Sequence, residues 1–189
     1  YPGKNLYAFG EGGSVTCKEQ KYHDLITTIK NQGCQVRYYH DMVGYNYRLE
    51  GIQGAVLSVS LQFLPEWTEK RRQIGRTYLA RITNPLLTMQ AHPENTDPVF
   101  HLFEITVEDP GDFISYMEKK EIECNRHYPV PCHLQKAYAK LGYQKGDCPN
   151  AEYLASHCVT LPLFPEMTEQ EVEMVIQACN TYKGNRING

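Results

Sequence analysis

Apolar side chains recur every three or four positions between residues 49 and 82, which is the spacing of one face of an α-helix. The first half of this stripe consists of Leu49, Ile52, Val56, Val59 and Phe63. The second half consists of Trp67, Ile74, Tyr78 and Ile82, with basic residues on the opposite side. Pro65 separates the two halves and lacks a backbone N–H, so the pattern predicts either one long kinked helix or two helices.

The segment before this stripe predicts a short strand and a helix. A glycine turn at residues 10–13 precedes Val15-Thr16-Cys17, whose residue types favour a strand. Residues 18–30 carry apolar side chains at helical spacing, and Asn31-Gln32-Gly33 is a helix stop signal. Residues 34–47 are polar and rich in tyrosine, which predicts a loop.

The segment after the stripe has a different sequence pattern. Three prolines in residues 84–98 predict a linker, and the alternating apolar residues of 99–107 predict a half-buried strand. Asp109-Pro110 is a helix start, and Thr168-Glu169-Gln170-Glu171 is a capping box that opens the last helix. The region between them predicts mainly loops. This mixture of strands and helices predicts an α/β fold.

Composition excludes several classes of protein. The chain of 189 residues has 19 Lys and Arg against 22 Asp and Glu and no long basic run, so nucleic acid is not an expected partner. The most apolar stretch, residues 55–64, is interrupted by Ser58, Ser60 and Gln62 and is too short to cross a bilayer, so no membrane partner is expected. Seven cysteines without a dense framework or a signal peptide favour free thiols in the cytoplasm.

Thiols and imidazoles cluster in the second half of the chain. They belong to Cys124, His127, Cys132, His133, Cys148, His157 and Cys158. Neither a CxxC pair nor an HExxH motif occurs among them, so we expect no metal site. Residue types alone leave a cysteine nucleophile with a histidine base open, but buried and inert cysteines are the favoured interpretation.

A set of longer motifs occurs in a fixed order along nearly the whole chain. In the first half they are Tyr1-Pro2-Gly3-Lys4-Asn5-Leu6, Gly10-Glu11-Gly12-Gly13, Arg37-Tyr38-Tyr39-His40 and Gly44-Tyr45-Asn46-Tyr47-Arg48-Leu49-Glu50-Gly51-Ile52-Gln53. In the second half they are His127-Tyr128-Pro129-Val130-Pro131-Cys132-His133-Leu134-Gln135, Leu141-Gly142-Tyr143, Gly146-Asp147 and Leu161-Pro162-Leu163-Phe164-Pro165-Glu166-Met167-Thr168. Together they resemble the DegT/DnrJ/StrS family of pyridoxal-phosphate-dependent sugar aminotransferases. Gly3 and Gly54 stand where that family usually has Thr and Ala.

The resemblance implies the aspartate-aminotransferase-like fold, fold type I of pyridoxal-phosphate enzymes. Residues 1–83 would be the end of the large cofactor-binding domain with a long connecting helix, and residues 84–189 the small C-terminal α/β domain. Family members are about twice as long, so we expect this chain to be the C-terminal half of an enzyme. Its large-domain part would then lack sheet partners and expose apolar surface.

The resemblance assigns the cofactor to three residues. Lys4 would be the catalytic residue that binds pyridoxal phosphate, since a lysine amine forms a reversible imine with an aldehyde. A related dehydratase branch has histidine there, so Lys4 favours transamination. Asn46 and Arg48 would reach the cofactor phosphate or substrate of the other subunit of a homodimer with shared active sites. The alternative is structural, with Asn46 as a helix cap and Arg48 as a surface charge.

The resemblance also assigns the substrate. His127 and Tyr128 would contact the sugar or nucleotide, His40 would line the same cleft, and Tyr1 would face the substrate. Structural packing is the alternative for these aromatic groups. The substrate would be a nucleotide-linked keto-sugar, with a 3-keto-6-deoxy sugar favoured over a 4-keto sugar, and the amino donor glutamate or glutamine. The competing hypothesis is a truncated, inactive paralogue that binds sugar nucleotides or dimerises.

Overall fold

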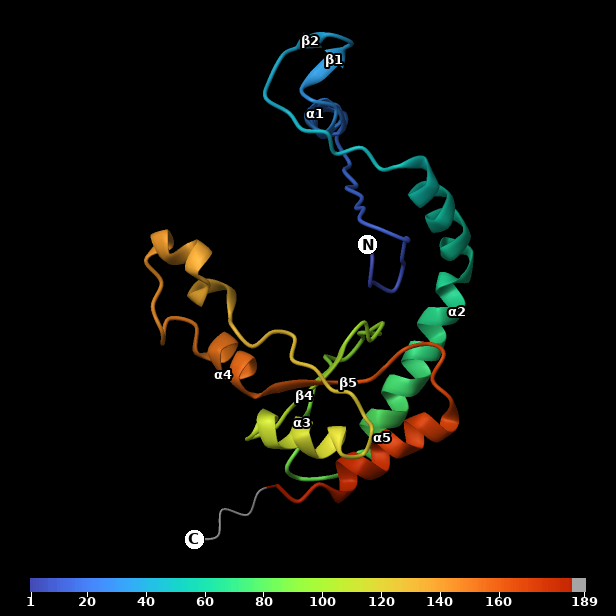
Figure 1. Cartoon of the computed structure of the whole chain (residues 1–189), viewed down its shortest axis with the longest axis vertical. Helices are drawn as coiled ribbons and strands as arrows, with labels where there is room; N and C mark the ends of the chain where they lie inside the picture. Colours follow the sequence, from blue (N-terminus) through green and yellow to red (C-terminus); the bar gives the residue numbers. More distant parts are fainter. Residues whose placement is uncertain (185–189) are drawn as a thin grey trace. The chain divides into compact units, whose positions relative to one another are not determined.

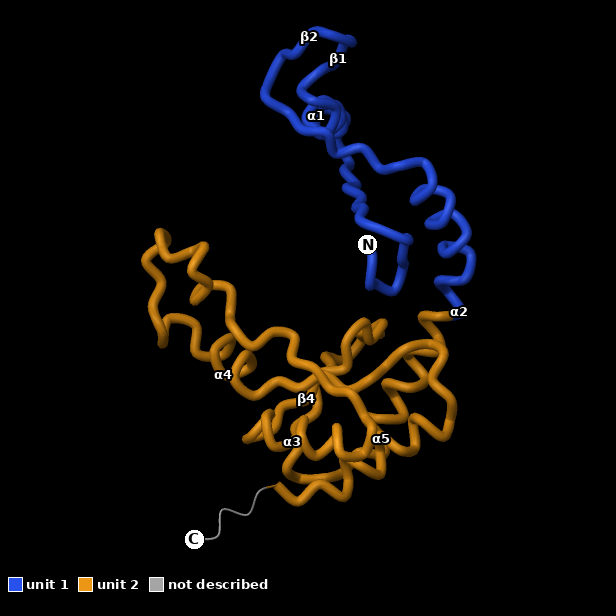
Figure 2. The backbone as a smooth tube through the Cα atoms, viewed as in Figure 1, with its two compact units in different colours: residues 1–66 blue, residues 67–189 orange. Residues whose placement is uncertain are grey.

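The computed structural model describes residues 1–184, and the chain divides into two compact units, residues 1–66 and a second that begins at Trp67 (Figure 2). A single helix, α2 (Gly51–Arg81), runs through the boundary and contains Pro65 (Figure 1). Of the two arrangements that the apolar stripe leaves open, the chain therefore adopts one continuous helix. The domain division at residue 83 stays a prediction, because these units are defined by contacts within this chain alone.

The first unit contains α1 (Gln20–Lys30) and a small antiparallel hairpin of β1 (Cys34–Val36) and β2 (Tyr39–His40). The helix predicted over residues 18–30 is confirmed. The loop predicted over residues 34–47 is wrong in part, because it contains this hairpin. The strand predicted at residues 15–17 is also wrong: the segment is irregular and pairs with no strand in residues 1–184, so its backbone lacks the partners that define a strand.

Two glycines allow the chain to fold back against the end of α1. A Cβ atom on Gly44 would lie 2.1 Å from the backbone nitrogen of Gly33, and one on Gly33 would lie 1.8 Å from the carbonyl oxygen of Met42. This close approach lets the N–H group of Tyr45 donate to the carbonyl of Ile29 at 2.7 Å. The last carbonyls of a helix have no partner within it, so the returning segment satisfies a group that would otherwise need water.

Apolar side chains of the first unit are extensively exposed. The exposed large hydrophobic residues of this unit outside α2 are Tyr7, Phe9, Val15, Tyr22, Leu25, Val36, Tyr38, Tyr39, Met42, Val43, Tyr45, Tyr47 and Leu49. Within α2, Ile52 and Val59 of the predicted apolar stripe are 71% and 57% exposed. The expectation that this part of the chain exposes apolar surface is confirmed, although a helical stripe normally faces a core.

The second unit is built on an antiparallel sheet in the order β3 (Thr88–Met89), β4 (Phe103–Thr106) and β5 (Cys158–Leu161). Phe103 and Ile105 are buried while Glu104 and Thr106 are partly exposed, which confirms the predicted half-buried strand. Glu104 lies opposite Thr160 in the register of β4 and β5. The segments predicted as linker and loops contain β3, β5 and a helix at residues 149–157, and none of these three elements was predicted from the sequence.

Three helices accompany this sheet: α3 (Pro110–Glu118), α4 (Pro149–His157) and α5 (Glu169–Thr181), together with two 3₁₀ helices, Cys132–Leu134 and Lys136–Leu141 (Figure 1). Asp109 caps α3 by accepting from the N–H of Asp112 at 2.9 Å. Thr168 and Glu171 form the capping box of α5. Both predicted helix starts are confirmed. No helix within residues 1–184 has the length and apolarity needed to cross a membrane.

The core of the second unit combines the C-terminal part of α2 with β4, β5, α3 and α5. Its fully buried side chains include Tyr78, Phe103, Phe113, Met117 and Cys179. The rings of Tyr78 and Phe103 meet edge to face, with centroids 5.2 Å apart. Burial of such large rings provides most of the hydrophobic stabilisation of a small domain.

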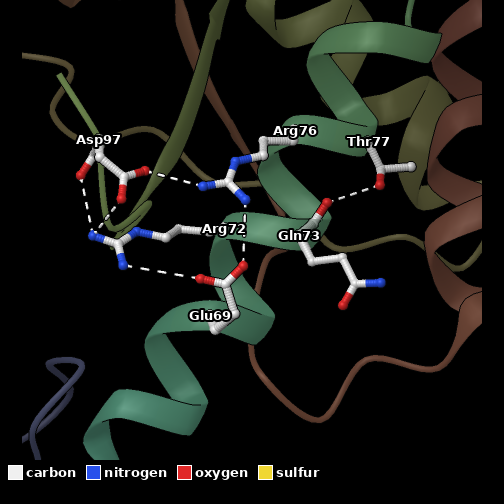
Figure 3. A network of polar contacts seen from close by, with 6 residues as sticks. All are labelled: Glu69, Arg72, Gln73, Arg76, Thr77 and Asp97. Carbon is white, nitrogen blue, oxygen red and sulfur yellow. Dashed lines mark hydrogen bonds and ion pairs between the residues drawn. The ribbon is translucent and has the colours of Figure 1, made fainter. Parts of the chain in front are cut away.

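An ion-pair network joins α2 to the proline-rich segment that follows it (Figure 3). Asp97 accepts from Arg72 at 2.9 Å and from Arg76 at 3.2 Å, and Arg76 also contacts Glu69 at 3.3 Å. The Arg72 side chain is 24% exposed, whereas the other three are more than half exposed. Exposed pairs contribute little individually, so this network mainly fixes where the segment lies along the helix.

Candidate active site

Lys4 lies in the irregular segment that precedes the glycine turn. Its side chain is exposed, and its ammonium group has no hydrogen-bond or ion-pair partner within residues 1–184. The Tyr1 ring packs against this turn so closely that a Cβ atom placed on Gly12 would lie 3.3 Å from it. The Tyr1 hydroxyl is 3.5 Å from that of Ser14. The first unit thus presents a free primary amine on a segment held against a glycine-rich turn.

Asn46 and Arg48 lie in the segment that returns against α1. Asn46 forms an isolated backbone bridge with Asn31, and the N–H of Tyr47 donates to the carbonyl of Lys30 at 3.0 Å. Arg48 Nε donates to Asn46 Oδ1 at 2.9 Å, so the structure brings these two predicted residues together. Asn46 does not cap α2, which begins at Gly51, so that part of the structural alternative is wrong.

His40 contacts its own hairpin. Its Nδ1 donates to the carbonyl of Gln32 at 2.8 Å and is 3.0 Å from Sγ of Cys34, the residue opposite it in the hairpin. The Cys34 side chain is buried, while His40 is exposed. One ring nitrogen is therefore used by the hairpin, and a substrate contact by His40 stays a prediction.

His127 and Tyr128 lie in the second unit, just beyond the backbone bridge between Asn125 and Thr160. His127 Nδ1 is 2.6 Å from Oγ1 of Thr160, and the Thr160 hydroxyl donates a short hydrogen bond to Oε1 of Glu104. The rings of His127 and Tyr128 meet edge to face with centroids 5.2 Å apart. Tyr128 is 65% exposed, so this pair presents a polar and aromatic surface to solvent.

Glu104, His127 and Tyr128 line a cavity of about 950 Å³ in the second unit. Its lining also includes Met89, His92, Val130, His133 and Leu154. The size suits a ligand larger than a single amino acid, since small-molecule sites span roughly 300–1,000 Å³. An apolar wall with a few convergent polar groups is the usual make-up of such a site.

A hydrogen-bonded carboxylate fixes one wall of this cavity. His133 Nε2 is 2.9 Å from Oε1 of Glu152 on α4, and the same oxygen accepts from the N–H groups of Gly146 and Cys148 at 2.8 and 3.3 Å. These bonds lower the pKa of Glu152, with the Gly146 N–H contributing most and His133 next. Three donors on one carboxylate hold the loop before α4 in place.

The predicted site residues therefore fall into two groups. Tyr1, Lys4, His40, Asn46 and Arg48 belong to the first unit, and His127 and Tyr128 to the second. Glu104 and Thr160, which form a hydrogen-bonded chain with His127, were not predicted from the sequence. Glu104 carried only the signal of a polar position in an alternating strand, and Thr160 lies in a strand that was not predicted at all.

A protein-family model, the DegT/DnrJ/EryC1/StrS aminotransferase family, matches residues 1–180. A dTDP-3-amino-3,4,6-trideoxy-alpha-D-glucose transaminase of Streptomyces venezuelae is 34% identical over 179 residues, covering 94% of this chain and 47% of the relative. A dTDP-3-amino-3,6-dideoxy-alpha-D-galactopyranose transaminase of Aneurinibacillus thermoaerophilus is 36% identical over 171 residues, covering 90% and 47%.

The crystal structure of S. venezuelae DesV in complex with a ketimine intermediate superposes on this chain with a TM-score of 0.91 and 34% identity. The match covers 95% of this chain and 49% of DesV. The fold and the motifs define an α/β chain of an aminotransferase family. It belongs to the DegT/DnrJ/EryC1/StrS aminotransferase family and spans about half the length of the curated relatives it matches. The family and the fold predicted from the motifs are confirmed.

Proposed function

We propose that this chain contributes to pyridoxal-phosphate-dependent transamination of a nucleotide-linked keto-sugar. The observation that carries the proposal is the exposed, unpartnered amine of Lys4 within the motif Tyr1-Pro2-Gly3-Lys4, in a chain that the family model matches from its first residue. The similar proteins named as transaminases of dTDP-linked amino sugars support the substrate class.

The residues present fit pyridoxal phosphate. With Arg48 Nε donating to Asn46 Oδ1, the Arg48 Nη groups and the amide nitrogen of Asn46 keep hydrogen atoms that no group within residues 1–184 accepts. Such donors suit phosphate oxygens, and a primary amine is the group that condenses with an aldehyde. In this proposal Lys4 holds the cofactor covalently, and Asn46 and Arg48 bind its phosphate or the substrate across a homodimer interface.

The cofactor, when bound, supplies an aldehyde for the amino group and an electron sink for the carbon that loses its proton. Lys4 Nζ then has two roles. It anchors the cofactor in the resting enzyme, and once released it carries a proton between two carbon atoms. The absence of an ion-pair partner for Nζ among residues 1–184 favours both roles, because a lysine held by a carboxylate would be free neither to condense nor to accept a proton.

The second unit provides the substrate contacts in this proposal. His127 and Tyr128 would bind the sugar or nucleotide at their cavity, and His40 and Tyr1 of the first unit are further proposed substrate contacts. A 3-keto-6-deoxy sugar is favoured over a 4-keto sugar, and the two relatives named for 3-amino sugars support that choice. Glutamate or glutamine would donate the amino group, and the enzyme would work as a cytoplasmic homodimer.

The test replaces Lys4 in the intact enzyme. Lys4→Ala should abolish both the visible absorption of covalently bound pyridoxal phosphate and amino transfer to the keto-sugar. Lys18→Ala, at another exposed lysine, is the matched control and should retain both. Retained turnover in Lys4→Ala would overturn the assignment of the lysine. Binding of sugar nucleotide without any amino transfer in the unsubstituted enzyme would instead favour the inactive paralogue.

A further inference from the structure

Three polar side chains of the second unit meet on one face of its sheet. Glu104 on β4 lies opposite Thr160 on β5. On the other side of β5, Asn125 and Thr160 exchange backbone hydrogen bonds at 3.2 and 2.7 Å. Side chains two residues apart along an extended chain point to the same face, so His127 reaches the face that carries Thr160 and Glu104.

The hydrogen bonds between these side chains have a defined direction. A carboxylate only accepts, so the Thr160 hydroxyl hydrogen points to Oε1 of Glu104. The hydroxyl oxygen then has only lone pairs left for His127 Nδ1, which is 2.6 Å away. Nδ1 must therefore carry a hydrogen. In the neutral ring the other nitrogen, Nε2, is then an acceptor.

The environment of Glu104 maintains the direction of the hydrogen bond from the Thr160 hydroxyl to the carboxylate. Glu104 is on the cavity wall with a side chain 17% exposed, and Oε2 is buried without a partner within residues 1–184. Arg126, the residue before His127, donates to the carbonyls of Ala155 and Ser156 at 2.6 and 2.9 Å. Burial raises the pKa of Glu104, while the Thr160 hydroxyl and His127 oppose that rise. The Thr160 hydroxyl is thus a main stabilising contact of the carboxylate.

We propose that Glu104 and Thr160 are positioning residues that hold His127 as the Nδ1–H tautomer and keep Nε2 as a hydrogen-bond acceptor for a ligand hydroxyl in the cavity. The inference rests on the proposed function in one respect only, since it takes that hydroxyl to be on the sugar nucleotide. An acceptor at this position selects a ligand that presents a donor, and it disfavours an analogue in which the hydroxyl is replaced by hydrogen.

The test measures the tautomer directly. Long-range ¹H–¹⁵N spectra of the histidine-labelled 189-residue chain, recorded where the ring is neutral, distinguish Nδ1–H from Nε2–H, and His127→Gln identifies the signal. We expect Nδ1–H in the native chain and in Thr160→Ser, which keeps the hydroxyl. In Thr160→Val the Nδ1–H tautomer should no longer predominate. Glu104→Gln should also lower the share of this tautomer, because an amide can donate to the Thr160 hydroxyl and reverse the direction of the hydrogen bond.

Glu123→Gln is the matched control, because Glu123 is an exposed carboxylate on the same stretch of chain as His127. It should leave the tautomer unchanged. A native chain with Nε2–H, or a Thr160→Val variant with unchanged tautomer, would overturn the inference. If Thr160→Val does not fold, Thr160→Ala removes the same hydroxyl, and Nε2–H in the native chain would overturn the inference by itself.

A second measurement separates this inference from the proposed function. In the intact enzyme, Thr160→Val should raise KM for the nucleotide sugar by about tenfold, the equivalent of one lost hydrogen bond, with little change in kcat. An altered tautomer with unaltered KM would support the positioning by Glu104 and Thr160, and it would contradict the assignment of His127 to the sugar.

Discussion

The hydroxyl of Tyr78 donates a hydrogen bond to the carbonyl oxygen of Pro162 at 3.0 Å, across 84 positions of sequence. Tyr78 lies on α2 and is fully buried, so this bond fastens the helix to the segment that follows β5. Burial also raises the pKa of Tyr78, so the phenol stays protonated and remains a donor over the whole physiological range.

Tyr78→Phe tests that bond. The substitution keeps the ring and leaves the Pro162 carbonyl without its donor, so we expect the free energy of unfolding to fall by about 1 kcal/mol. Urea denaturation followed by circular dichroism measures the change. Tyr138→Phe is the control, because Tyr138 is half exposed and should lose almost nothing. Equal losses in the two variants would contradict a role for the buried bond.

The close approach of Gly75 on α2 to the ring of Phe100 can be tested by substitution. A Cβ atom there would lie 2.6 Å from the ring of Phe100, so Gly75→Ala should destabilise the second unit by about 1–3 kcal/mol. Gly54, on the same helix, has nothing within 4 Å of such an atom, and Gly54→Ala should stabilise by up to about 1 kcal/mol, as alanine does in helices. Thermal unfolding of the two variants measures both changes. Shifts of the same sign would show that helix propensity outweighs the contact with Phe100.

The sequence predicted those helices and strands that are defined by contacts between residues close together in the chain. Asp109 accepts from a backbone N–H three residues later, and Thr168 and Glu171 bond each other over the same interval. A helix start of this kind is complete within four residues, so its motif predicts it without knowledge of the rest of the fold. The apolar stripe is also a local signal, and it predicted helical structure over the residues of α2 while leaving open whether they form one helix or two.

Strand β5 could not be predicted from local sequence signals. Cys158–Leu161 is short and buried throughout, so it has no polar alternation to distinguish it from a loop. Its identity as a strand comes from pairing with β4, which lies far away in the sequence. The candidate site could likewise be predicted only in part from local sequence signals. The motif His127-Tyr128-Pro129 indicates His127, but Thr160 and Glu104 follow only from contacts across 33 and 56 positions.

The reactivity of the cysteines should follow their burial. Burial raises the pKa of Cys124 and of Cys179 from 9.0 to about 12, which lowers the reactive thiolate fraction roughly a thousandfold near pH 8. Cys17 and Cys132 are exposed. We expect iodoacetamide to modify the exposed pair first in the native chain, as measured by mass spectrometry of peptides. All four should react after unfolding, and early modification of Cys124 would contradict the packing of the core.

The carboxylate of Glu152 should make the loop before α4 sensitive to acid. Its pKa is lowered in the folded chain, first by the N–H of Gly146 and then by His133, so the ionised form contributes stability at neutral pH. That contribution is present above the ordinary glutamate pKa of 4.5 and is lost as the pH falls from there through the lowered value.

Hydrogen exchange of the Gly146 amide should report this loss. Protection of that amide is expected at pH 6, to decline as the pH falls below 4.5 after correction for intrinsic exchange, and to be weak at both pH values in Glu152→Ala, which removes the acceptor. Glu118→Ala, at an exposed glutamate at the end of α3, is the control and should behave as the native chain does. Full protection of Gly146 in Glu152→Ala would show that the loop is held by its own backbone, and that the carboxylate contributes nothing to the cavity wall.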